Sequence, residues 1–265
     1  MAALLLDMDG VLYEEDRAVS GAVETIGWLR EQGVRFLFLT NTTSRPRSAL
    51  VEKLARFGIR TSEDEIFTPP VAASTWLSSH AEGPAALFVP DATAAEFEGV
   101  PLLAHDAERG AASVVIGDLG KSWDFDTLNR AFRLLMDDPP PALVALGMTR
   151  YWRAADGLRL DVAPFVAALE RAAGVEAVVL GKPARPFFEA AAERLGTALE
   201  DLVMVGDDVV GDVQGAQRAG IRGVLVRTGK FRPSDLDGEI RPDAVLESIS
   251  ELPTWWSGGG ARAGD

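Results

Sequence analysis

Leu4-Leu5-Leu6-Asp7-Met8-Asp9-Gly10, close to the start of the chain, combines a short apolar run with two carboxylates and a glycine. The leucines predict a buried strand, and the glycine marks its end. Residues two apart in an extended segment point the same way, so we expect Asp7 and Asp9 to lie close together. Neighbouring anions need a cation or a shared proton, and carboxylate oxygens suit Mg²⁺. Taken alone, the stretch fits an ordinary Asp/Gly turn equally well.

A second acidic cluster follows another predicted strand far along the chain. Leu202-Val203-Met204-Val205 runs into Gly206-Asp207-Asp208-Val209-Val210-Gly211-Asp212, which repeats the order of apolar strand, glycine and carboxylates. Ligands of parallel α/β sheets bind at the carboxyl ends of the strands. Two strands of this kind, side by side, would bring several carboxylates to one point, which favours a metal site over two separate turns.

Two further predicted strands end in groups that suit an anion. Residues 34–39 lead into Thr40-Asn41-Thr42-Thr43, whose hydroxyl and amide groups can donate hydrogen bonds. Residues 177–180 lead into Gly181-Lys182-Pro183, which would place one positive charge at the same end of the sheet. The Gly-Lys pair is not a Walker phosphate loop, because Pro183 stands where Ser or Thr is required.

Together these four stretches, in this order and at strand ends, resemble the four motifs of the haloacid dehalogenase superfamily of phosphatases. The resemblance implies that Asp7 is the nucleophile and Asp9 the general acid and base. It implies that Mg²⁺ is held by Asp7, Asp207 and the backbone carbonyl of Asp9.

The same resemblance assigns the remaining polar groups. Thr40, Asn41 and Lys182 would hold the phosphoryl oxygens of a small phosphorylated substrate. Asp208 and Asp212 would orient the metal ligands or Lys182.

The chain is most similar to the superfamily's subclass IIA, which has a large cap between the second and third motifs. Matches over residues 206–213, 227–235, 150–152 and 157–161 resemble a branch that hydrolyses pyrophosphate, phospholysine and phosphohistidine. Vertebrate members of that branch often carry Ser where this chain has Asp9. A general acid at this position predicts activity on phosphomonoesters as well, because an alkoxide leaves only with a proton.

Strands alternate with helical patterns along the whole chain, which predicts an α/β fold with a Rossmann-like parallel sheet. We expect a discontinuous core of residues 1–72 and 177–252, and an inserted α/β cap domain over 73–176. Strands within the cap are predicted at 86–89, 113–116 and 143–146, and helices at 126–136 and 161–173. Residues 253–265, with their glycines, are predicted to be a flexible tail.

Composition excludes several classes of function. The net charge of −14 disfavours binding to nucleic acid or an anionic membrane. The absence of cysteine excludes disulfides and thiolate chemistry, and two histidines are too few for a His-rich metal site. Neither a leader segment nor an apolar run of about 18 residues is present, so we expect a cytoplasmic location.

A homodimer formed through the cap is a further expectation. The resemblance implies it, and Trp123 and Phe125 are predicted to be exposed aromatic residues there.

Three other functions fit part of the pattern. A receiver-like phosphoacceptor module also uses strand-end aspartates, Mg²⁺, Thr and Lys, but a base at Asp9 and a large insert work against it. A phosphotransferase or phosphomutase on the same fold remains open. A non-catalytic binding protein is disfavoured because every motif residue is present.

Overall fold

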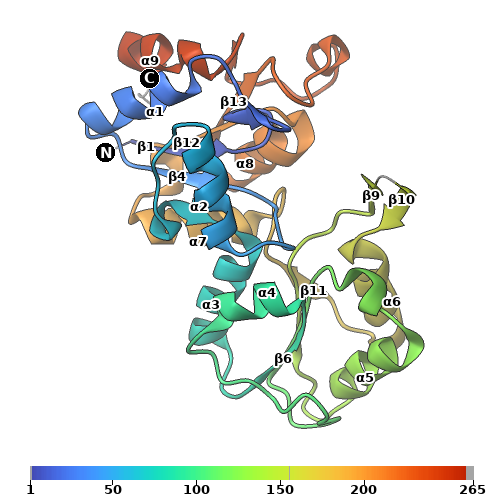
Figure 1. The fold of residues 1–265 in the computed structure, drawn as a ribbon. Coiled ribbons are helices and arrows are strands. Elements are labelled where there is room, and N and C mark those ends of the chain that lie inside the picture. Colours follow the sequence, from blue (N-terminus) through green and yellow to red (C-terminus); the bar gives the residue numbers. More distant parts are fainter. Residues whose placement is uncertain (1, 155, 261–265) are drawn as a thin grey trace. The chain divides into compact units, whose positions relative to one another are not determined.

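The computed structural model describes residues 2–154 and 156–260 (Figure 1). The chain divides into two compact units. One, the core unit, comprises the residues up to Thr40, Arg47–Phe67 and the residues from Lys182 on. The other, the inserted unit, comprises Asn41–Pro46 and Thr68–Gly181.

A parallel sheet of six strands organises the core unit, in the order β14-β13-β12-β1-β4-β5 (Figure 1). The strands are β1 (Ala3–Asp7), β4 (Phe36–Leu39), β5 (Ile66–Phe67), β12 (Leu202–Gly206), β13 (Arg222–Val226) and β14 (Ala244–Leu246). Strands β1 and β12 lie at the centre and are buried throughout, as their apolar runs predict. Leu6 pairs with Val205, so Asp7 and Asp207 emerge at the same edge of the sheet.

Helices cover this sheet. They are α1 (Ala22–Glu31), α2 (Arg47–Arg56), α7 (Arg185–Leu195), α8 (Gly215–Ala219) and α9 (Leu252–Trp255). Their buried faces follow the apolar stripes of the sequence, with Ile26 and Leu29 on α1 and Phe187 and Phe188 on α7. A small hairpin, β2 (Tyr13–Glu14) and β3 (Arg17–Ala18), follows the turn after β1.

The carboxyl end differs from the expected flexible tail over residues 253–260. Helical turns continue from α9 to Gly260, whose carbonyl accepts a hydrogen bond of 2.6 Å from Arg222. Trp255 and Trp256 pack against the core cluster, and this burial of aromatic surface holds the segment in place. Residues 261–265 of the predicted tail lie outside the described part of the chain.

The inserted unit has its own parallel sheet, in the order β11-β8-β7-β6, and a separate hairpin (Figure 1). The sheet strands are β6 (Ala85–Phe88), β7 (Ser113–Ile116), β8 (Ala142–Ala145) and β11 (Ala177–Val179), and the hairpin strands are β9 (Tyr151–Ala154) and β10 (Gly157–Leu160). The helices are α3 (Pro69–His80), α4 (Asp91–Ala94), α5 (Phe125–Leu135) and α6 (Val162–Ala173). This is the mixed α/β fold with a second α/β unit that the sequence predicts.

One predicted strand belongs to the other sheet. We expected residues 177–180 to join the core sheet, but β11 pairs with β8 in the inserted unit, with Val178 opposite Val144. Its apolar residues are equally suited to either sheet, so the sequence pattern does not distinguish the partners. The chain returns to the core unit only at Lys182.

Trp123 is less exposed than predicted. It stacks between Phe88 and Phe165, with ring centroids 6.0 and 4.6 Å apart, whereas Phe125 is 77 % exposed. Among the described residues, no helix is both long and apolar enough to cross a membrane.

Candidate active site

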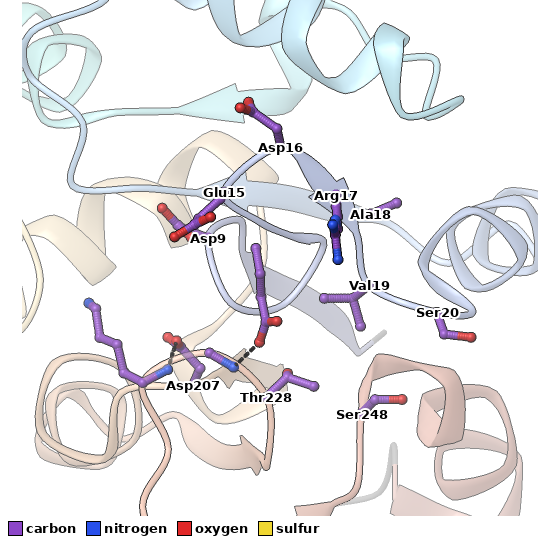
Figure 2. Close-up of a pocket in the computed structure, with 13 residues that line it drawn as sticks. Asp9, Glu15, Asp16, Arg17, Ala18, Val19, Ser20, Asp207, Thr228 and Ser248 are labelled. Carbon is purple, nitrogen blue, oxygen red and sulfur yellow. Dashed lines mark hydrogen bonds between the residues drawn. The ribbon is translucent and has the colours of Figure 1, made fainter.

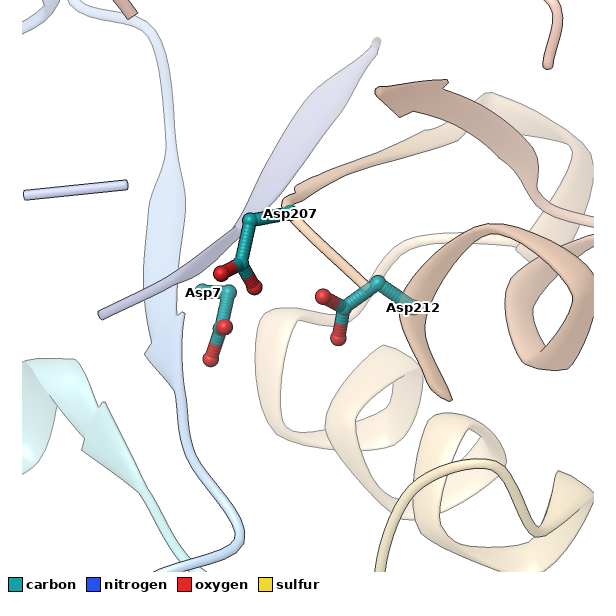
Figure 3. Close-up of side chains that lie close together, drawn as sticks. All are labelled: Asp7, Asp207 and Asp212. Carbon is teal, nitrogen blue, oxygen red and sulfur yellow. The ribbon is translucent and has the colours of Figure 1, made fainter. Parts of the chain in front are cut away.

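Three buried aspartates meet at the carboxyl edge of the core sheet (Figure 3). Asp7 is the last residue of β1, Asp207 follows the last residue of β12, and Asp212 comes from a short π-helix, Val209–Gln214. One carboxylate oxygen of each lies within 4.8 Å of those of the other two. The strand register therefore brings together residues about two hundred positions apart in the sequence.

Lys182 neutralises part of this charge. Its Nζ lies 2.6 Å from Oδ1 of Asp7 and 2.7 Å from Oδ1 of Asp212, and all three side chains are buried. One ammonium thus pairs with two of the three carboxylates. When all are ionised the cluster is left with a net negative charge, which a buried site does not tolerate without a further cation or bound protons.

The pKa values of these side chains reflect the excess of negative charge and the burial of the cluster. Burial raises the pKa of Asp207 to about 6, and the nearby Asp212 adds to the rise. Burial raises the pKa of Asp212 to about 6 as well, against the opposing effect of Lys182. The pKa of Asp7 is also raised by burial, while Lys182 works to lower it. For Lys182, burial alone would lower the pKa, but the charges of Asp212 and Asp7 outweigh it and raise the value.

The cluster fits a hard divalent cation. Asp207 is buried, with only 1 % of its surface exposed, yet its Oδ1 has no hydrogen-bond partner among the described residues. An unpaired buried carboxylate oxygen is costly, and a metal ion satisfies it. Carboxylates without His or Cys suit Mg²⁺ or a similar ion. Asp212, which was expected to orient the metal ligands or Lys182, lies in the same cluster as Asp7 and Asp207.

Asp208 shapes the loop that carries Asp212. Its Oδ1 accepts hydrogen bonds from the N–H groups of Val210 and Gly211 at 3.1 and 2.8 Å, and its own N–H donates to Oδ2 of Asp212 at 3.1 Å. Burial works to raise the pKa of Asp208, but these hydrogen bonds and Lys230 lower it overall. Asp208 therefore lies where it can orient Asp212.

Asp9 does not belong to the buried cluster. Strand β1 ends at Asp7, so the extended geometry that would align the two side chains stops there. Asp9 is exposed and lines a pocket of about 1030 Å³ in the core unit together with Asp207 (Figure 2). Its side chain is thus open to a ligand in that pocket.

Thr40 and Asn41 fall on either side of the division between the units. Leu39 pairs with Asp7 in the sheet register, so the buried Thr40 lies at the edge where Asp7 emerges. Asn41 groups with the inserted unit.

Two glycines, which the sequence reasoning did not single out as site residues, enclose Asp207. A Cβ on either Gly10 or Gly229 would lie 2.0 Å from Oδ2 of Asp207, and both have positive φ, at +81° and +65°. Only glycine fits both the space and the backbone conformation. In the sequence, these positions could have been noticed because Gly10 directly follows Asp9 and Gly229 stands between Thr228 and Lys230.

The parallel core, the inserted α/β unit and the buried aspartates define a haloacid dehalogenase-like hydrolase, and the chain belongs to this family. Residues 4–101 match the model of haloacid dehalogenase-like hydrolases, and residues 179–252 match a second model described as HAD-hydrolase-like.

Two named relatives support this family assignment. Over 253 residues the chain is 39 % identical to phospholysine phosphohistidine inorganic pyrophosphate phosphatase of Homo sapiens, covering 94 % of this chain and 91 % of the relative. It is 42 % identical over 246 residues to haloacid dehalogenase-like hydrolase domain-containing protein 2 of Bos taurus, covering 93 % and 91 %.

The fold is similar to that of solved phosphatases. The 4-nitrophenylphosphatase of Thermotoga maritima superposes with a TM-score of 0.83 at 28 % identity, over 96 % of this chain and 97 % of the other. The chain is accordingly an enzyme of the phosphatase type within this family, in the subclass with a large inserted cap.

Proposed function

We propose that the protein is a Mg²⁺-dependent phosphatase that hydrolyses a small phosphorylated substrate through an aspartyl-phosphate on Asp7. The observation that carries the proposal is the buried cluster in which Asp7 lies against Lys182, at 2.6 Å, beside the unpaired oxygen of Asp207. Strongly perturbed carboxylates next to an open pocket are typical of catalytic sites.

In the first step, a carboxylate oxygen of Asp7 attacks phosphorus and the bond to the leaving group breaks. Asp9 donates a proton to the departing oxygen or nitrogen. Water then attacks phosphorus, Asp9 takes its proton, and the bond to Asp7 breaks to release phosphate. Lys182 and Thr40, with Asn41, are proposed to hold the phosphoryl oxygens.

Asp7 and Asp207, with the backbone carbonyl of Asp9, are the proposed ligands of the divalent ion. Such an ion would offset the repulsion between the Asp7 carboxylate and an anionic phosphate. Lys182 can then hold Asp7 and Asp212 in place while they remain ionised.

Removal of metal tests the proposal. The experiment dialyses the protein against EDTA, then passes it into metal-free buffer and assays release of phosphate from 4-nitrophenyl phosphate. We expect activity to fall to the background and to return with Mg²⁺. Full turnover in the metal-free protein would contradict the metal assignment.

The substrate class is proposed to include phosphoanhydride, phosphoramidate and phosphomonoester bonds. The first two follow from the relative named for phospholysine, phosphohistidine and pyrophosphate, and the third from the exposed general acid Asp9. A panel of phosphorylated metabolites, assayed for free phosphate with Mg²⁺, would rank them. If an added alcohol acceptor captured most of the phosphoryl groups instead of water, the alternative of a phosphotransferase on the same fold would replace hydrolysis.

Self-association through the inserted unit is proposed as well. The β9–β10 hairpin exposes Tyr151, Leu158 and Leu160, and Phe125 is exposed on α5. A second copy of the chain would cover such apolar surface. Light scattering at micromolar concentration that gave the monomer mass of 28.3 kDa would contradict this.

A further inference from the structure

Three successive residues after β13 each donate a hydrogen bond toward the active-site edge of the core unit. The hydroxyl of Thr228 donates to the carbonyl of Gly10. The N–H of Gly229 donates to Oε1 of Glu14 at 2.6 Å, and the N–H of Lys230 donates to Oδ2 of Asp207 at 2.7 Å (Figure 2, dashed lines). We call this segment the 228–230 loop. It links the β2–β3 hairpin to a proposed metal ligand.

Space around Asp207 is so limited that the position of this loop sets the position of the carboxylate. Gly10 and Gly229 approach each other closely on either side of Oδ2, since a Cβ built on Gly229 would lie 2.5 Å from Cα of Gly10. A displaced loop would therefore move or release Asp207, because neither wall of this narrow space has side-chain freedom to adapt.

Glu14 is the member of this network that no proposed chemical step uses. Its carboxylate is exposed, yet it accepts a short hydrogen bond from a backbone N–H at the centre of the loop. Hydrogen bonds to an ionised acceptor are stronger than those between neutral groups, and removing one frees the backbone donor to move.

We propose that Glu14 is a positioning residue that holds the 228–230 loop so that the N–H of Lys230 orients Asp207 for a divalent cation. The inference rests on the proposed metal site. It assigns Glu14 no contact with substrate or cation. Loss of a group that orients a metal ligand without binding the metal typically changes metal affinity by about 10–100-fold. Glu14 acts on Asp207 only indirectly, through the 228–230 loop, so we expect the lower end of that range.

The test measures binding of Mn²⁺ to the substrate-free protein by electron paramagnetic resonance, for the wild type and four variants. Glu14→Ala should weaken Mn²⁺ binding by about tenfold. Glu14→Gln keeps an acceptor oxygen and should stay within about threefold of the wild type. Asp16→Asn is the matched control, because Asp16 lies on the same hairpin turn and points away from Asp207 in Figure 2. Among the described residues it makes no hydrogen bond to the 228–230 loop, whose Gly229 N–H donates to Glu14.

Glu14→Asp keeps the test decisive if the alanine variant fails to fold. It retains the charge but is one methylene shorter, so it should weaken Mn²⁺ binding as Glu14→Ala does. Wild-type affinity in Glu14→Ala or Glu14→Asp would overturn the proposal. So would a loss in Glu14→Gln as large as in Glu14→Ala, since the effect would then come from charge alone.

Amide hydrogen exchange separates this proposal from that of the metal site. The N–H groups of Gly229 and Lys230 should exchange faster in Glu14→Ala than in the wild type, with no metal present. If the wild type bound no Mn²⁺, the metal assignment would fail while the exchange rates still tested the loop. Unchanged exchange at both residues would show that Glu14 does not hold it.

Discussion

Each of the two units contains a parallel sheet in which a strand is followed by glycine and aspartate. In the core unit Gly206 ends β12 and Asp207 follows it, and in the inserted unit Gly117 and Asp118 follow the end of β7. Asp118 is only half-buried and its Oδ1 accepts a hydrogen bond from the N–H of Gly120 at 2.9 Å, which makes an ordinary local turn.

The core unit instead buries its strand-end charges together. Asp7, Asp207 and Asp212 are almost fully enclosed, and Asp7 and Asp212 share the ammonium of Lys182. Burying several like charges opposes stability, so a sheet edge that does so is under a functional requirement. A position at a strand end is thus shared by aspartates of both units, whereas convergence and burial of the charges distinguish the chemical site.

Substituting the matched aspartates tests this difference most strongly. Asp7→Asn should lower turnover of 4-nitrophenyl phosphate by at least about 10³-fold, because an amide cannot replace the nucleophile. Asp118→Asn should change it by less than about threefold, because the half-buried local turn keeps its hydrogen-bond acceptor in a near-isosteric amide. Steady-state rates and circular dichroism of both proteins check the outcome. Comparable losses in the two variants would remove the distinction between the sheets.

The variant Asp9→Ser tests the role of the exposed carboxylate beside the buried cluster. Asp9→Ser should lower hydrolysis of an alkyl phosphate by about 10²–10⁴-fold, the usual contribution of a general acid. In kcat/KM, which reports the steps up to loss of the leaving group, pyrophosphate and 4-nitrophenyl phosphate should lose less, because their leaving groups depart as stabilised anions. Rates on the three substrates give the comparison. An equal loss on all of them would mean that Asp9 mainly places the metal or the water.

The smallest expected effect is on how the free energy of unfolding depends on pH. The pKa values of Asp207 and Asp212 are about 6 in the folded protein against an ordinary 3.8, so the folded state binds more protons than the unfolded state between these limits. These groups therefore make the free energy of unfolding of the metal-free protein fall as pH rises from about 4 to about 6.

Asp207→Asn removes one of the two charges. It should raise the melting temperature of the metal-free protein at pH 7 by about 2–6 °C and by less at pH 5. Thermal melts in EDTA, with Asp118→Asn as the control, measure this. A variant that melted below the wild type at pH 7 would show that the Asp207 charge stabilises the apo fold.

Local patterns predicted much of this molecule. The apolar runs before Asp7 and Asp207 became the two central strands, and their parallel register follows from the alternation of strands and helices. The pairing of β11 with β8 was not predictable, because the residues of a short apolar strand do not indicate which sheet it joins.

Within the site, the sequence placed Asp7, Asp207 and Lys182 at one edge, since their motifs follow predicted strands. It did not separate Asp9 from the cluster, because that depends on where β1 ends. Nor did it reveal the contact between Glu14 and Gly229, which are 215 residues apart and joined by a backbone N–H that no side-chain pattern reports.

The central claim is that Asp7 carries the phosphoryl group during turnover. Asp9→Asn should still form the intermediate from 4-nitrophenyl phosphate, whose leaving group needs no proton, but should hydrolyse it slowly. Acid quench after mixing, borohydride reduction and peptide mass spectrometry then locate the acyl phosphate. The account predicts a burst of one nitrophenol per site and conversion of Asp7 to homoserine, dependent on substrate and metal. A burst with Asp7 unmodified and the phosphoryl group on another residue would contradict it.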